Sequence, residues 1–80
     1  MELTVVVHQE RADFWSEINE LPGCFASGGT LTELREALGE SIGLYLWDVA
    51  IELPDQPLAL GESIIHVVAP AGRSRSPAEP

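Results

Sequence analysis

The sequence predicts a small α+β domain made of a three-stranded antiparallel meander, one long helix packed on the sheet, and a final strand. Two observations support this fold class. Three short β-type segments precede a long segment whose apolar residues recur at spacings of three and four, and one more β-type segment follows it. This order is typical of a helical layer on one face of an antiparallel sheet. A domain of this size buries only about 60% of the surface that its unfolded chain exposes, so we expect a single core.

Three β segments are expected before the helix, at residues 3–8, 14–19 and 24–27. The first is the β-branched run Leu-Thr-Val-Val-Val-His, and the polar stretch that follows it has the length of a hairpin loop. Alternation along the second segment places Trp15 and Glu17 on one face and the apolar Phe14 on the other. We therefore expect Trp15 and Glu17 on the sheet face that the helix leaves uncovered.

The long helix is expected to begin after Thr30, because Thr30 and Glu33 have the spacing of a capping box. Its apolar stripe would extend over about six turns. The stripe comprises Leu31, Leu34, Leu38, Ile42, Tyr45, Val49 and Leu53. Pro54 prevents the helix from continuing, and residues 63–68 are expected to form the last strand.

The chain is strongly acidic, with four basic residues, thirteen acidic residues and a formal net charge of −9. Nucleic-acid binding draws its affinity from Lys and Arg that neutralise phosphates, so direct DNA or RNA binding is not expected. The charge favours a basic protein partner, whose encounter it would accelerate by roughly 10- to 1,000-fold. The folded domain is expected to span residues 1–70, with a disordered tail at residues 71–80.

No enzymatic activity, metal site or cofactor is expected. The centre of the first strand holds no acidic residue, which argues against a metal-dependent nuclease. His8 and His66 would form a pair only if their strands were neighbours in matching register, and Cys24 has no activating neighbour in the sequence. Cys24 is also the only cysteine, so no intrachain disulfide forms. Neither a secretory leader nor an apolar span of about 20 residues is present, so we expect a cytoplasmic protein.

A string of motifs resembles the HicB-like antitoxin family. Glu-Leu-Pro-Gly-Cys at residues 20–24 stands between a strand and the Gly-Gly-Thr-Leu helix start at residues 28–31, and the resemblance extends from about Leu3 to Val68. It implies a partial RNase H-like fold with the same element order. It also implies neutralisation of HicA, a small basic mRNA-cleaving toxin.

Two groups of residues are candidate partner-binding sites. The first is Trp15 with Glu17, because aromatic residues dominate protein interfaces. Alternatively, Trp15 closes a small second core beneath the loops or the tail. The second group lies on the helix. It comprises the acidic residues Glu36 and Glu40 and a row at four-residue spacing formed by Gly39, Gly43 and Trp47.

The glycine row raises two hypotheses. Each glycine costs about 1 kcal/mol relative to alanine in a helix interior, so we hypothesise that the row receives another chain. In the alternative, Trp47 packs over its own helix. Small size also favours a homodimer or higher oligomer, for which the last strand is one candidate edge.

The sequence thus predicts a non-enzymatic, antitoxin-like binding module that occludes the RNA site of a small basic HicA-like ribonuclease. Two alternatives remain open. One is an orphan oligomeric domain of the same fold with another protein or a small-molecule ligand. The other is a regulator that acts on DNA only through its toxin-bound complex.

Overall fold

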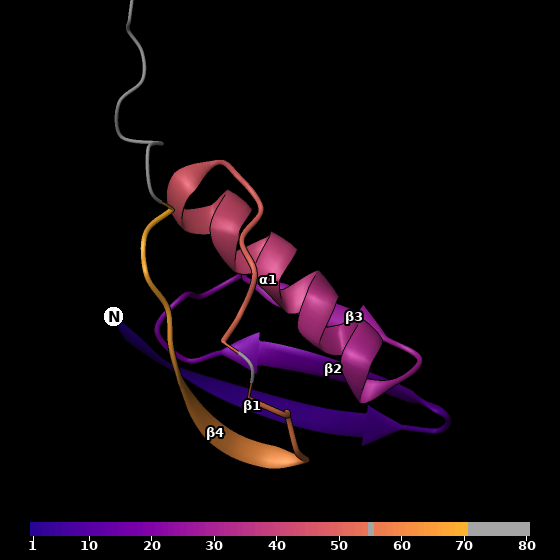
Figure 1. The fold of residues 1–80 in the computed structure, drawn as a ribbon. Coiled ribbons are helices and arrows are strands. Elements are labelled where there is room, and N and C mark those ends of the chain that lie inside the picture. The colour runs from indigo at the N-terminus through magenta and orange to yellow at the C-terminus, as the bar shows by residue number, and fades with distance from the viewer. Residues whose placement is uncertain (55, 71–80) are drawn as a thin grey trace, which may run out of the picture.

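The computed structural model describes residues 1–54 and 56–70, so the tail predicted at residues 71–80 lies outside the described residues. The fold is α+β, with the predicted order of three strands, a helix and a fourth strand (Figure 1). Its elements are β1 (Glu2–Glu10), β2 (Asp13–Ile18), β3 (Phe25–Gly28), α1 (Leu31–Trp47) and β4 (Gly61–His66). No helix among the described residues is both long and apolar enough to cross a membrane.

The four strands form one antiparallel sheet in the order β3-β2-β1-β4. β1 is central, since β2 pairs with it on one side and β4 on the other. The β1–β2 hairpin is tighter than predicted, because Glu10 pairs with Asp13 and only two residues remain in the turn. Arg11, the first central residue of this turn, has a φ of 60°, and a positive φ at this position is typical of two-residue hairpin turns.

One face of the sheet carries the core. Alternation along β1 buries Leu3, Val5 and Val7, which are at most 2% exposed. α1 packs over β2 and β3 on this face, and its fully buried residues are Leu34, Leu38 and Ile42. The central part of the predicted apolar stripe is therefore confirmed.

The capping box at the start of α1 is confirmed in an altered form. The Glu33 backbone N–H donates to Thr30 Oγ1 over 3.0 Å, as predicted. The Glu33 carboxylate reaches one residue further back than in the usual box and accepts from the Gly29 N–H at 2.9 Å. Gly28 is required here, because a Cβ on it would lie 2.6 Å from the Leu34 nitrogen.

The prediction that the helix runs to Pro54 is wrong. α1 ends at Trp47, and Asp48 takes the left-handed conformation with a φ of 60° and donates its N–H to the Gly43 carbonyl. Tyr45 does not join the core either. Its side chain is about half exposed, and its hydroxyl donates to the Pro22 carbonyl over 2.9 Å.

After Asp48 the chain reverses and returns along α1, as Figure 1 shows. This return segment, residues 49–53, packs on the helix, since the Ile51 N–H donates to the Gly39 carbonyl over 3.3 Å. Leu53, and Leu58 further along, are buried in the core. α1 lies closest to β3 and β2, and these two leucines belong to the same core cluster as the buried residues of β1 and β4.

Candidate protein-binding surface

The face of the sheet opposite to α1 carries no helix in Figure 1. We call this surface the open face. Strand alternation and register place on it Thr4, Val6, His8, Trp15, Glu17, Phe25, Ser27, Glu62, Ile64 and His66.

An aromatic cluster lies on the open face across three strands. The rings of His8 on β1 and Trp15 on β2 stack with centroids 4.2 Å apart. Phe25 on β3 lies beyond Trp15 at a centroid distance of 6.5 Å and remains 57% exposed. The cluster follows from the register, which places His8 opposite Trp15 and Phe25 diagonally beside it.

Acidic side chains border this cluster. Glu17 stands between Val6 and Phe25 in the register, and its Oε2 lies 2.9 Å from His8 Nε2. Glu62 on β4 is opposite Val6 on the other side. The described strand positions of the open face hold no lysine or arginine, and the cation nearest to the cluster is Arg11 of the β1–β2 turn, which lines a hollow with Trp15, Glu10 and Asp13. The open face therefore combines exposed aromatic area with negative charge.

A further acidic residue, Glu20, follows β2 and binds β1. Glu20 accepts two hydrogen bonds from Thr4, one from the backbone N–H at 2.7 Å and one from the hydroxyl at 2.8 Å. These bonds, the backbone one first, lower the pKa of the Glu20 carboxyl from its usual value. Glu20 thus stays ionised and occupies a β1 donor that β2 no longer reaches.

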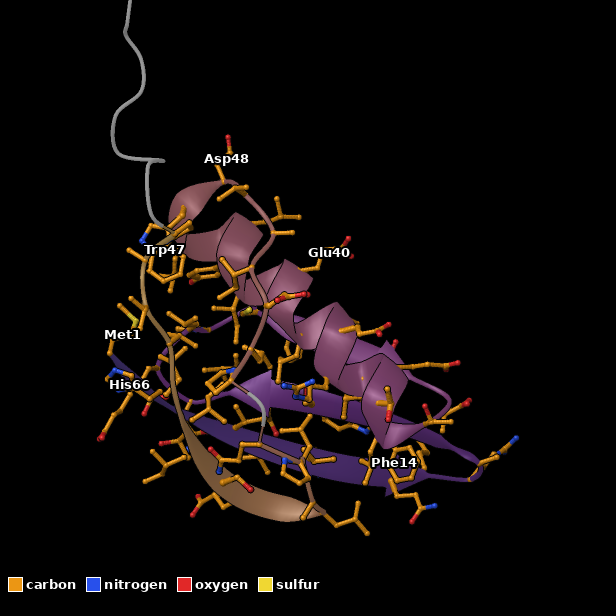
Figure 2. The ribbon with its side chains drawn as sticks, viewed as in Figure 1. Met1, Phe14, Glu40, Trp47, Asp48 and His66 are labelled. Carbon is orange, nitrogen blue, oxygen red and sulfur yellow. The ribbon has the colours of Figure 1, made fainter. Side chains whose placement is uncertain are left out.

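The predicted site residues do not form one surface. Trp15 and Glu17 lie together on the open face, as their alternation predicts. Glu36 and Glu40 are exposed on α1, and Figure 2 shows Glu40 directed away from the sheet. Trp47 is partly buried at the end of α1, where it lines a cleft with Met1, His66 and Val67. A small partner that binds Trp15 therefore does not contact Glu40 in the same subunit.

The hypothesis that the Gly39–Gly43 row receives another chain is corrected by the structure. A Cβ on Gly43 would lie 2.1 Å from the Val49 carbonyl oxygen, and one on Gly39 would lie 2.4 Å from that of Ile51. The return segment of the same chain fills the row. The two glycines allow this close approach of backbone to helix, which explains their presence in a helix interior.

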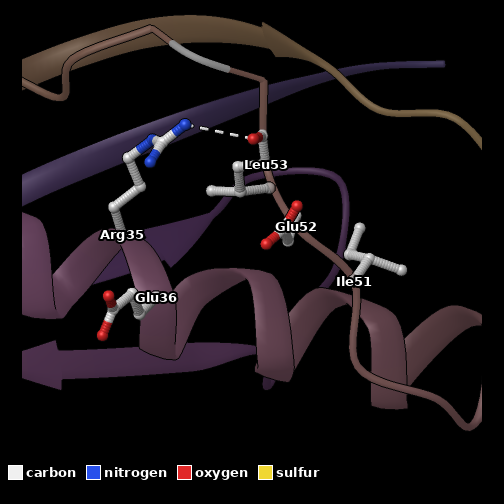
Figure 3. A pocket seen from close by; sticks show the side chains of 5 residues that line it. All are labelled: Arg35, Glu36, Ile51, Glu52 and Leu53. Atoms are coloured by element: carbon white, nitrogen blue, oxygen red, sulfur yellow. Dashed lines mark hydrogen bonds between the residues drawn. The ribbon is translucent and has the colours of Figure 1, made fainter.

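A second hollow lies between α1 and the return segment (Figure 3). Its volume is about 530 Å³, and Arg35, Glu36, Ile51, Glu52 and Leu53 line it. The Arg35 guanidinium donates to the Leu53 carbonyl over 3.1 Å and also bonds the Pro54 carbonyl. Arg35 therefore holds the return segment against the helix, which is a structural role.

The residues considered for catalysis are not assembled into a site. β1 and β4 are neighbours, but His8 pairs with Trp15 at one end of β1 while His66 pairs with Glu2 at the other end. Six residues of strand, about 20 Å, separate the two positions. Burial raises the pKa of the Cys24 thiol, which disfavours the nucleophilic thiolate. Among residues 1–54 and 56–70, no three His, Cys, Asp or Glu side chains gather as metal ligands would.

Sequence reasoning did not select Phe25 or Ile64 for the open face. Both carry a detectable signal, since alternation places Phe25 opposite in direction to the buried Ala26, and Ile64 opposite to the buried Ile65. The sequence predicts that both residues lie in strands, but the sheet face of each side chain depends on strand pairing, which the sequence does not give.

Comparison with known proteins adds no assignment. No family model matches the chain, and no match was found among curated proteins or solved structures.

Proposed function

We propose that the protein is a non-enzymatic, antitoxin-like module that binds a small basic HicA-like ribonuclease in the cytoplasm and covers its RNA site. The observation that supports this proposal best is the open face, which presents Trp15 and Phe25 beside Glu17. The resemblance of the motif string at residues 20–31 to the HicB-like family supports the class of partner.

The chemistry of the open face suits a cationic surface. A Lys or Arg side chain placed over Phe25, or over the ring face of Trp15 that His8 does not cover, gains a cation–π interaction, which is worth about 0.5–2 kcal/mol depending on how far the site is desolvated. The Glu17 carboxylate stands next to both rings in the register and supplies a charge-assisted hydrogen bond to the same cation. An RNA-binding site attracts phosphates by the same cations, so an acidic aromatic face competes with RNA for them.

The acids of α1 take a different role in this proposal. Glu33, Glu36 and Glu40 are exposed on the layer opposite to the open face and do not share a contact surface with Trp15. They add to the field that speeds encounter with a basic partner. Their removal is therefore expected to slow association without changing the dissociation rate.

The test uses the purified chain and the small basic protein encoded beside it. Binding is measured by calorimetry at low and at high salt, and RNA cleavage by the partner is measured with and without the chain. We expect salt-sensitive binding that abolishes cleavage. Phe25→Ala should weaken binding about 10- to 30-fold, as loss of an aromatic hot spot does. Leu44→Ala is the matched control, because Leu44 is 54% exposed on α1, close to the 57% of Phe25.

Two results would contradict the proposal. Equal losses for Phe25→Ala and Leu44→Ala would remove the open face as the contact surface. Absence of binding, or cleavage that continues in the bound complex, would leave an oligomeric binding domain with another ligand.

A further inference from the structure

The sheet has two edge strands, β3 and β4, and the chain treats them differently. The β3 edge is short and closed by the helix, since Ser41 Oγ donates to the Phe25 carbonyl over 2.8 Å and α1 packs closely on Gly28. No described residue other than those of β1 pairs with β4. An unpaired edge of this kind is a template for another strand.

The hydrogen bonds of β1 identify which β4 groups face outward. Met1 and Val67 exchange both backbone bonds, at 2.7 and 2.8 Å. Because bonded and non-bonded pairs alternate along an antiparallel ladder, Ile65 and Ser63 also direct their N–H and C=O groups toward β1. The backbone groups of Glu62, Ile64 and His66 therefore point to the free edge.

We propose that β4 pairs antiparallel with β4 of a second copy, with Ile64 opposite Ile64 of that copy. In this register Glu62 lies opposite His66 of the partner subunit, and the second such pair follows by symmetry. The outward-facing N–H and C=O groups of Glu62, Ile64 and His66 then lie opposite those of the second copy, as a hydrogen-bonded antiparallel pair requires. The inference is independent of the proposed function.

Two neighbouring two-fold registers also satisfy the backbone, and the side chains decide against them. Moving the centre to Ser63 places the Glu62 carboxylate opposite Ile64, and moving it to Ile65 places His66 opposite Ile64. Each of these buries an ionisable group against an aliphatic side chain. The register centred on Ile64 pairs an aliphatic group with its copy and a carboxylate with an imidazole, and such cross-strand pairs are favourable.

Exposure along this edge supports the same register. Ile64 and Val68 are the two most exposed large hydrophobic side chains that the structure describes, at 61% and 70%. Leu60, at 54%, precedes β4 by one residue. The proposed register brings Leu60 near Val68 of the second copy, so three exposed apolar side chains per subunit gain cover at once. The dimer carries one continuous sheet of eight strands with both open faces on the same side.

The experiment measures the oligomeric state of the full 80-residue chain by sedimentation equilibrium over a wide concentration range. Ile64→Lys should raise the dimer dissociation constant at least about tenfold, because like charges directly opposite each other destabilise a strand pair. Phe25→Lys is the control, since Phe25 is equally exposed on the same face but at the other edge. It should leave the dissociation constant unchanged.

Cross-linking tests the register itself. Ile64→Cys, oxidised by glutathione disulfide, should form a covalent dimer roughly tenfold faster than Phe25→Cys, because pairing raises the effective concentration of the two thiols. The native Cys24 is buried and contributes little.

The proposal is overturned if the native chain stays monomeric at the highest concentration. It is also overturned if both lysine variants dissociate the dimer equally, which indicates face-to-face stacking. Neither result bears on toxin binding, which the Phe25→Ala experiment measures separately.

Discussion

Replacement of Gly43 by alanine tests how α1 and the return segment pack. The new Cβ would lie 2.1 Å from the Val49 carbonyl oxygen and 2.8 Å from the Ile51 nitrogen, whereas ordinary contact begins at 3.4 Å. Both neighbours are backbone atoms and cannot rotate away. The return segment must therefore move away from the helix by more than an ångström near Gly43.

Opposing effects determine the magnitude. Alanine is the better helix former by about 1 kcal/mol, which favours the variant. Overpacking typically costs about 1–3 kcal/mol. Displacement of the return segment also exposes part of Leu53, whose complete burial is worth about 1.5–3 kcal/mol. We expect a net destabilisation of about 2 kcal/mol.

Urea unfolding followed by circular dichroism measures this effect. For a small domain, 2 kcal/mol lowers the midpoint by about 1–2 M urea. Leu44→Ala, at the next and exposed position, is the control and should change stability by no more than about 0.5 kcal/mol. A Gly43→Ala protein as stable as the parent, or more stable, would refute the packing argument and reopen this row as a surface for another chain.

Three further predictions follow from single side chains. Ser16 is fully buried, and its Oγ has no hydrogen-bond partner among the described residues. Ser16→Ala should therefore stabilise the fold by about 1 kcal/mol in the same urea assay. A loss of stability would show that the hydroxyl has a hydrogen-bond partner in solution. Asp48→Gly should also stabilise the fold by about 1 kcal/mol, because glycine adopts the left-handed φ without strain and the change removes a negative charge from the C-terminus of α1. A lower urea midpoint than that of the parent would contradict this. The lowered pKa of Glu20 means that its bonds to Thr4 stabilise the fold above the usual glutamate pKa and are lost as the pH falls through the lowered value. The stability difference between the parent and Glu20→Gln should therefore shrink in acid, and a difference that is constant with pH would exclude this linkage.

The fold was predictable because most of its elements carry a local signal. The β-branched run in β1, the Thr30–Glu33 cap and the core positions Leu34 and Leu38 each follow from sequence spacing. The end of the helix was not predictable in this way. Val49 and Leu53 continue the helical spacing, but Asp48 reverses the chain, so Leu53 reaches the core from a return segment.

The candidate site was predictable only within single strands. Alternation alone put Trp15 and Glu17 on one face, because that pattern is a property of one segment. Joining them to His8 and Phe25 requires the cross-strand register, which depends on turn lengths and pairing. For the glycine row, the sequence predicts the contact but not its partner. Gly39 and Gly43 mark a close approach correctly, but the sequence does not say whether the approaching backbone belongs to another chain or to the same one.

The core is covered by two kinds of chain. A regular helix lies nearest to β2 and β3, whereas the chain between α1 and β4 covers part of the core without regular structure and is held by Leu53, Leu58 and the Arg35 bonds. Such a segment has few backbone bonds of its own and opens with a lower free energy than the whole domain. Amides beneath it should exchange with solvent before those beneath α1. Unfolding of this protein is thus expected to begin as a separate step at the β4 side, with the hairpin and helix still in place.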